Sequence, residues 1–272
     1  MKAQTSGPLG AITALVLLAL SSGLTTHAQA QRGSNPAGMR VADAAHLLDS
    51  NDPDEIRMGI ENLGLSGRAT AIPPLTARIE RGLPRPLLEA AVETLGVLAN
   101  PAAGPILFRL ADHRVPSVRL AALQAIVSCR PRGADAALIE ALGDLDPRVR
   151  GAAAIGLGEL GARGSLDALF HAFDRGVIES VTSIGQLADA PATDRLLGYL
   201  ERVPLDSINP GLNEIFARAD VSNAIKLRIV GRLGELATPE VRTYLSDLSA
   251  ALPDAGGELG RAIQDAMSRI SE

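Results

Sequence analysis

One amphipathic pattern recurs along the chain, and it is clearest at residues 146–161, where the sequence reads DPRVRGAAAIGLGELG. Its apolar residues follow the three- and four-residue spacing of one helix face. Asp146 and Pro147 are typical of a helix N-terminus, and Gly161 is typical of a helix end. The pattern therefore predicts a helix with one buried face.

The same pattern occurs seven times, each copy marked by a Leu-Gly pair or its equivalent. The mark residues are Leu63, Leu95, Ile126, Leu157, Ile184, Leu233 and Met267, spaced by 32, 31, 31, 27, 49 and 34 residues. A second amphipathic segment precedes each copy, so each unit is predicted to be an antiparallel helix pair that buries its apolar face by stacking on its neighbours. We expect an all-α protein, a right-handed α-solenoid of about seven helix pairs over residues 39–272.

The spacing of 49 residues indicates an insertion of about 18 residues at 204–221. Proline residues and a short helical pattern at 212–219 predict an inserted loop plus one extra helix that interrupts or kinks the stack. Insertions in solenoids often contribute to binding, so Asn213, Glu214 and Phe216 are candidate partner-binding residues. The alternative is that Phe216 only fills a gap between repeats.

The first thirty residues are typical of a secretory signal peptide. They contain Lys2, an apolar stretch at Leu9–Leu20 and a small-x-small site at Ala28–Ala30. An uncleaved anchor is the alternative, although the stretch is shorter than a membrane span. Residues 1–30 are therefore predicted to be removed and residues 31–38 to form a flexible lead-in. We expect an exported protein, periplasmic or secreted, with no membrane span after cleavage.

The composition favours helices and an aliphatic core. The chain is 46% hydrophobic but has no Trp, two Tyr and four Phe, so Ala, Leu, Val and Ile must form the core. The net charge of -5 and the interleaving of Arg with acidic residues argue against nucleic-acid binding. Cys129, the one cysteine, is expected to be a packed apolar residue rather than a nucleophile.

Catalytic and metal-binding patterns are not found in the sequence. The histidines His27, His46, His113 and His171 lack a second His or Cys at metal-ligand spacing. Gly156 and Gly158 lie within a predicted helix, with no preceding strand, and indicate close helix packing rather than a phosphate loop. We therefore expect no cofactor, no metal and no enzymatic activity.

The segment DPRVRGAAAIGLGELG resembles the second helix of the HEAT-like repeat known from phycobilisome lyases, and the resemblance extends over residues 39–272. It implies a protein-binding scaffold or adaptor; the alternatives are a structural subunit of a cell-envelope complex and, more remotely, a lyase-like chromophore-attachment protein or a chaperone. In this family the Asp and Arg of the D-P-x-V-R signature commonly tie neighbouring repeats. Here that role carries over to Asp146 with Arg150, and partly to Arg119.

The predicted binding surface is the side of each second helix that faces away from the buried residues. Counted from the position of Val149, the third, sixth, seventh and tenth positions are expected to line the concave side. In the central copies they are mostly apolar, which predicts a groove for an apolar peptide, a partner helix or a second copy of the protein, with acidic residues at one end selecting a basic flank. The alternative is that curvature or the inserted helix covers these side chains. The predicted partner-binding residues are Glu89, Glu93, Leu120, Leu123, Gln124, Val127, Ile155, Ile178, Val181, Leu227 and Val230.

Overall fold

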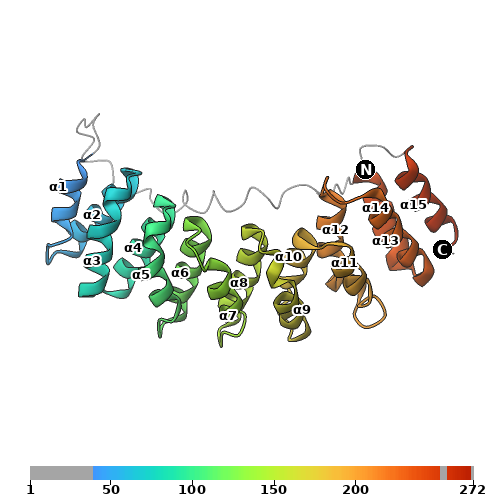
Figure 1. Ribbon diagram of the computed structural model, residues 1–272, viewed down its shortest axis with the longest axis horizontal. Coiled ribbons are helices and arrows are strands. Elements are labelled where there is room, and N and C mark those ends of the chain that lie inside the picture. The colour runs from blue at the N-terminus through green and yellow to red at the C-terminus, as the bar shows by residue number, and fades with distance from the viewer. Residues whose placement is uncertain (1–38, 252–255, 271–272) are drawn as a thin grey trace, which may run out of the picture.

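The computed structural model describes residues 39–251 and 256–270, which form a curved rod of α-helices without a strand (Figure 1). Short 3-10 turns precede α3, α5, α9 and α12. The helices are α1 (Val41–Leu47), α2 (Pro53–Leu65), α3 (Ile72–Arg81), α4 (Arg85–Leu98), α5 (Gly104–Ala111), α6 (Pro116–Cys129), α7 (Ala134–Ala141), α8 (Pro147–Leu160), α9 (Leu166–Asp174), α10 (Ser180–Leu187), α11 (Ala190–Leu197), α12 (Asn209–Ala217), α13 (Asn223–Leu236), α14 (Pro239–Ala251) and α15 (Glu258–Ser268).

These helices confirm the α-solenoid predicted from the repeat pattern. Seven pairs follow one another, and α12 is one helix more than the pairs require. We call α1, α3, α5, α7, α9, α11 and α14 the first helices, and α2, α4, α6, α8, α10, α13 and α15 the second helices. The second helices from α2 to α10 pack on one another in sequence order, and each also packs on its own first helix. In Figure 1, α6, α8 and α10 lie on the inner side of the curve, and α7 and α9 lie on the outer side.

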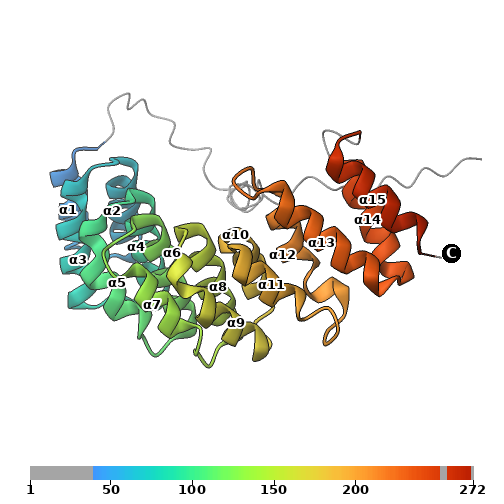
Figure 2. The same cartoon turned by 45° about the vertical axis from the view of Figure 1, so that its right-hand side comes forward.

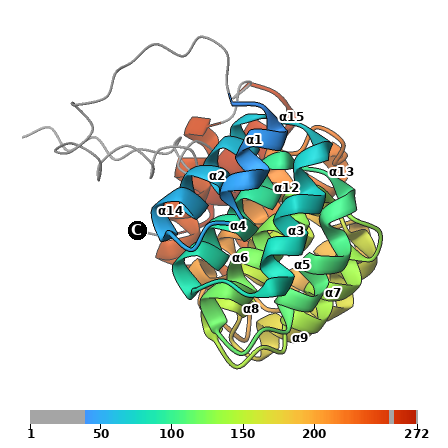
Figure 3. The ribbon, with the colours of Figure 1, turned by 90° about the vertical axis from the view of Figure 1, so that its left-hand side faces the viewer.

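The views from other directions show that the rod twists along its length. Seen from the α1 end, the pairs are stacked behind one another and successively displaced, as in a superhelix (Figure 3). At the C-terminal end α13, α14 and α15 lie together (Figure 2), and α15 packs on both of the others. The core is therefore one continuous aliphatic layer between the two rows of helices, with the buried leucines of every repeat contributing to it.

The Leu-Gly mark of the repeat has a direct packing role. The mark leucine is buried between the two helices of its pair, and the next residue faces the following second helix. A Cβ on Gly96 would lie 3.2 Å from the Cα of Ala125 on the following second helix. Gly156, which comes just before its mark residue, faces the preceding second helix instead, and a Cβ there would lie 2.6 Å from Cγ2 of Val127. Small residues therefore allow the second helices to approach closely. The interpretation of the Gly156 region as close helix packing is confirmed.

The extra helix α12 packs directly on α10, in the place where the next second helix would lie. A Cβ on Gly185 would lie 2.1 Å from the carbonyl oxygen of Gly211, and one on Gly211 would lie 2.5 Å from that of Val181. The two backbones are thus in contact where the glycines meet. As a result, α13 packs on α11 and α15 rather than on α10.

Two basic side chains bind the carbonyl groups at the C-terminal ends of α10 and α12. Arg218 Nη1 donates to the carbonyl oxygens of Gly185 (3.1 Å) and Ala188 (2.7 Å) at the end of α10. Lys226 Nζ, from α13, donates to those of Phe216 (2.8 Å) and Arg218 (2.9 Å) at the end of α12. These bonds satisfy carbonyl groups that a helix end leaves without an intrahelical partner.

The predicted signal peptide, residues 1–30, and the predicted lead-in, residues 31–38, lie outside the described residues. Within residues 39–251 and 256–270, none of the helices has the length and apolar character needed to cross a membrane.

Candidate protein-binding surface

Each central second helix is covered on three sides, by its own first helix and by the second helices before and after it. At about 100° per residue, the positions two before and two after the mark residue lie opposite the first helix. We call the exposed residues at these positions of α2, α4, α6 and α8, together with Met58, the inner strip, because they lie on the inner side of the curve. The inner strip consists of Met58, Glu61, Leu65, Glu93, Val97, Gln124, Ser128, Ile155 and Glu159.

The continuous apolar groove expected from the sequence is not formed. Leu123, Val181 and Val230 are buried, so the prediction that they face solvent is wrong. They lie three residues before the mark, which is only about 60° from it around the helix, and they therefore pack into the core. Three other apolar residues predicted to line the groove are half-buried: Leu120, Val127 and Leu227.

Four of the predicted residues are exposed, and three of them belong to the inner strip. Glu93, Gln124 and Ile155 occupy the same position, two residues before the mark, on α4, α6 and α8. Ile178 is exposed in the turn before α10 and is not on the same line. The inner strip is consequently mixed in polarity rather than a row of apolar side chains.

The two acidic residues predicted to select a basic flank differ in their surroundings. Glu89 is half-buried, accepts a hydrogen bond from the hydroxyl of Ser117 on α6 and lies 3.8 Å from Nε of Arg85. It therefore joins two repeats. Glu93 is exposed and its carboxylate pairs with none of the described residues, and the same holds for Glu61 at the equivalent position of α2.

Two exposed apolar residues on the inner strip were missed by the sequence reasoning. Leu65 is 84% exposed and Val97 is 74% exposed, each two residues after the mark on adjacent second helices. Each follows its mark residue, Leu63 or Leu95, by two positions, and this spacing can be read from the sequence. The sequence pattern alone did not identify them because the position two after the mark was not counted among those that face the concave side.

The insertion residues hold α12 in the stack. Phe216 is buried, which excludes it as a partner contact and agrees with the alternative that it fills a gap between repeats. Asn213 Oδ1 accepts a hydrogen bond of 2.9 Å from the hydroxyl of Tyr244 on α14, and burial raises the pKa of that hydroxyl. Glu214 is half-buried, and its Cβ would lie 2.8 Å from a Cβ on Gly185.

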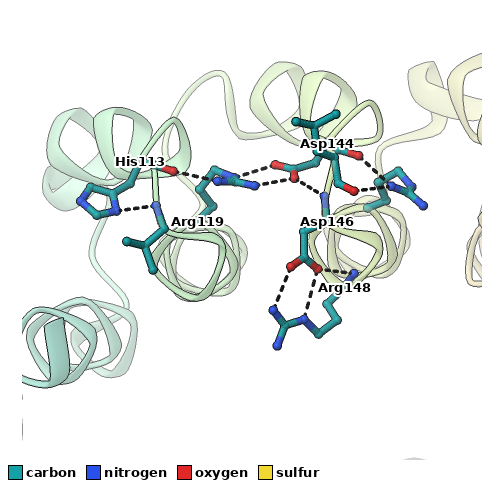
Figure 4. Close-up of polar contacts among 8 residues, drawn as sticks. His113, Arg119, Asp144, Asp146 and Arg148 are labelled. Atoms are coloured by element: carbon teal, nitrogen blue, oxygen red, sulfur yellow. Dashed lines mark hydrogen bonds and ion pairs between the residues drawn. The ribbon is translucent and has the colours of Figure 1, made fainter.

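The strongest polar tie between repeats joins Arg119 on α6 to Asp144, which precedes α8 (Figure 4). Arg119 Nε and Nη2 donate to the two carboxylate oxygens at 2.7 and 2.6 Å, and Nη1 donates to the carbonyl oxygen of His113 at 2.9 Å. The two side chains are only 14% and 11% exposed. The Arg119 guanidinium accordingly holds the pKa of Asp144 below its ordinary value.

The tie that the family resemblance implied, Asp146 with Arg150, is not formed. Arg150 Nη1 donates to the carbonyl oxygens of Asp144 (2.8 Å) and Leu145 (3.1 Å) instead. Asp146 accepts from the backbone N–H of Arg148 at 2.9 Å, which starts α8, and from the Arg148 side chain. This arrangement lowers the pKa of Asp146 to about 2. Because the Asp146 carboxylate caps the start of α8, it does not bind Arg150.

Groups suited to catalysis do not converge in the described residues. Cys129 is buried, its thiol donates to the carbonyl oxygen of Leu95 at 3.2 Å, and burial raises its pKa, so it does not provide a thiolate nucleophile. Within the described part of the chain, His, Cys, Asp and Glu form no group of three or more able to hold a metal ion.

A rod of stacked helix pairs with an exposed strip along its inner side is the architecture of an α-solenoid. The family model described as HEAT repeats matches residues 42–127 and 109–188, more than half of the 272-residue chain. The chain therefore belongs to the HEAT-repeat family.

Several known structures are similar to this chain. They include the complex of CpcE and CpcF of phycocyanin lyase from Nostoc sp. PCC7120, with 19% identity over 89% of this chain and 97% of that chain and a TM-score of 0.49. A homology model of the full-length AP-3 complex has 15% identity over 85% of this chain and 51% of that chain, with a TM-score of 0.53. A designed armadillo repeat protein in complex with peptide (KR)4 has 16% identity over 86% and 100%, with a TM-score of 0.42. No curated protein sequence matches this chain.

Proposed function

We propose that the protein is an exported, non-enzymatic interaction module, a scaffold or adaptor that holds a partner protein against its inner strip. The observation that carries this proposal is the pair Leu65 and Val97, exposed in equal register on adjacent second helices. The unpaired carboxylates of Glu61 and Glu93 lie one helical turn before them. Apolar contacts flanked by unpaired charge are typical of a recognition surface.

The spacing of the helices defines the shape of the partner segment. Packed helices lie about 8–10 Å apart, so equivalent residues of α2 and α4 repeat at about that distance. A polyproline II segment presents the same side every three residues, which is about 9 Å. The partner is therefore an extended segment that crosses the second helices, with apolar residues three positions apart and Lys or Arg between them.

A peptide-display selection on the full chain tests this function. We expect enrichment of sequences with apolar residues three positions apart and adjacent basic residues. For a selected peptide, replacing Leu65 and Val97 together by Ser should raise the Kd at least tenfold, since about 1.4 kcal/mol is lost when two partly buried side chains are removed from the contact. Ile178→Ser is the matched control, because Ile178 is also exposed but lies off the inner strip.

The charged residues provide a second arm of the same test. Glu61→Gln with Glu93→Gln should weaken peptide binding and reduce its dependence on salt, because two carboxylates no longer attract the basic residues. Equal affinity of the original chain and the Leu65/Val97 double variant, or a loss of the same size in the Ile178 variant, would contradict the proposed use of the inner strip.

A further inference from the structure

A cleft of about 650 Å³ opens on the outer row of the rod, between α5 and α7. Its α7 wall includes the small residues Ala136, Ala137 and Ala141, together with Glu140. At the positions equivalent to Ala137 and Ala141, large buried side chains are found in three other places: Ile106 and Leu110 in α5, Leu169 and Phe173 in α9, and Leu196 and Leu200 in and directly after α11. The cleft thus exists because α7 lacks the side-chain volume that these other segments carry at the same positions.

The ion pairs that tie successive first helices are interrupted on both sides of α7. Such pairs are Asp49–Arg81, between the end of α1 and α3, Glu80–Arg109, between α3 and α5, and Asp167–Arg195, between α9 and α11. In the described residues no such pair joins α7 to α5 or to α9. Three charged side chains line the cleft, Asp112, Arg114 and Glu140, and their charged groups form no ion pair or hydrogen bond with the described part of the chain.

The polar groups at the floor of the cleft are already satisfied by one another. Arg119 and Asp144 form the buried pair described above, and His113 Nδ1 accepts from the backbone N–H of Val115 at 3.2 Å (Figure 4). The groups of this cleft that remain free to contact another molecule are therefore its apolar wall and its three unpaired charges. At the rim stands Leu145, which is 95% exposed and is the most exposed large apolar side chain of the described chain.

One patch therefore contains an exposed apolar side chain, Leu145, an apolar cleft wall, one unpaired cation, Arg114, and two unpaired anions, Asp112 and Glu140. A two-fold interface requires this combination, because the same patch must supply both halves of every contact. A binding site for an unrelated partner needs only one side of each contact, because the partner supplies the other side. We propose that two copies of the protein associate through this cleft about a two-fold axis, with Leu145 of each copy inserted against Ala137 and Ala141 of the other.

The charges have a defined place in the dimer. Arg114 of each copy faces Glu140 of the other, which supplies an ion pair at a junction where the single chain has none. The inner strips stay free, since they lie on the opposite row of helices. The dimer thus presents two inner strips to partners, and its formation is independent of the function proposed for them.

Sedimentation velocity of the full chain over a range of concentrations tests the dimer. We expect the mass of two chains at the upper end of the range. Arg114→Glu and Glu140→Arg should each raise the dimer Kd at least tenfold, because each places like charges opposite one another. The double variant with both reversals should restore the original Kd, since every cross-copy pair is again of opposite sign. Arg132→Glu is the matched control, because Arg132 is exposed and unpaired but does not line the cleft.

Variants of the apolar residues test separately whether Leu145 of one copy enters the cleft of the other. Leu145→Ala and the cleft-filling Ala141→Leu should each weaken the dimer, and thermal melting of each variant shows whether the monomer stays folded. A chain that is monomeric at every concentration, or a dimer that neither charge reversal weakens, would overturn the proposal. Failure of the double reversal to restore association would also overturn it.

Discussion

At the scale of single residues, the structure separates charges that hold the repeats together from charges that only neutralise each other at the surface. Arg119 and Asp144 are largely buried, bidentate and shared between two repeats. Arg148 and Asp146, a few residues away, form a pair in which the guanidinium is exposed. Salt bridges of the first kind are costly to break, whereas those of the second kind contribute little.

Replacing Asp144 by Asn should lower the free energy of unfolding by about 2–3 kcal/mol at pH 7, because a guanidinium is left largely buried without its charged partner. Urea unfolding measures the change. Arg148→Ala is the control, and it should cost less than about 1 kcal/mol. Similar losses in the two variants would show that Asp144 is an ordinary surface charge.

The same residue predicts a pH dependence. Because the pKa of Asp144 is lowered in the folded chain, its contribution is fully present above the unfolded pKa of about 3.9 and is lost as pH falls through the lower folded pKa. The stability difference between the original chain and Asp144→Asn should therefore be constant above about pH 5 and shrink below about pH 4. A difference that grows as the pH falls would contradict the assignment.

At the scale of elements, α12 is an integral part of the stack and not a loop laid over it. Its glycine meets the glycine of α10 at backbone contact, and the residues after it form bonds to the ends of both helices. Such a crossing leaves no room for a side chain, because the opposing atoms are carbonyl oxygens that cannot move without the helix.

Gly211→Ala should consequently destabilise the protein by about 2–3 kcal/mol through overpacking. Gly231→Ala is a matched control within a helix, since a Cβ there meets nothing within 4 Å. That change should be neutral or stabilise by up to about 1 kcal/mol, because alanine favours the helix. Thermal melting compares the two variants, and hydrogen exchange shows whether α12 loosens first. Equal melting temperatures would mean that α12 is a dispensable insertion.

At the scale of the whole molecule, the curved rod separates two surfaces. The inner strip lies on the second helices and the cleft lies between two first helices, so the proposed partner and the proposed second copy would not compete for the same residues. The core between them is aliphatic and continuous along the rod.

Export is a further prediction at this scale. Lys2, the apolar stretch and the small-x-small site at Ala28–Ala30 predict that the mature chain begins at Gln31. Mass spectrometry of the protein from its native cells should find Gln31 as the first residue in the fraction outside the cytoplasm. An intact Met1 or Lys2 peptide on most molecules would contradict export with cleavage.

The sequence by itself determined the elements and their order. Helix periodicity, the N-terminal Asp-Pro and the Leu-Gly mark are local properties, so the seven pairs and an extra helix near 212–219 could be predicted without knowing the neighbours. The packing role of Gly156 was predictable for the same reason, because small residues within an apolar helix face indicate close approach of another helix.

The tertiary structure decided which side chains remain exposed and which charges pair. Leu123 is buried and Leu65 is exposed because they lie on different sides of their helices, and which sides are covered depends on the neighbouring helices, which the pattern of one helix does not contain. Asp144 rather than Asp146 binds Arg119 because Asp146 begins α8, and a carboxylate that closes a helix end is not available elsewhere. The cleft at Ala141 arises from the volume missing between two helices, a quantity that exists only once the helices are packed.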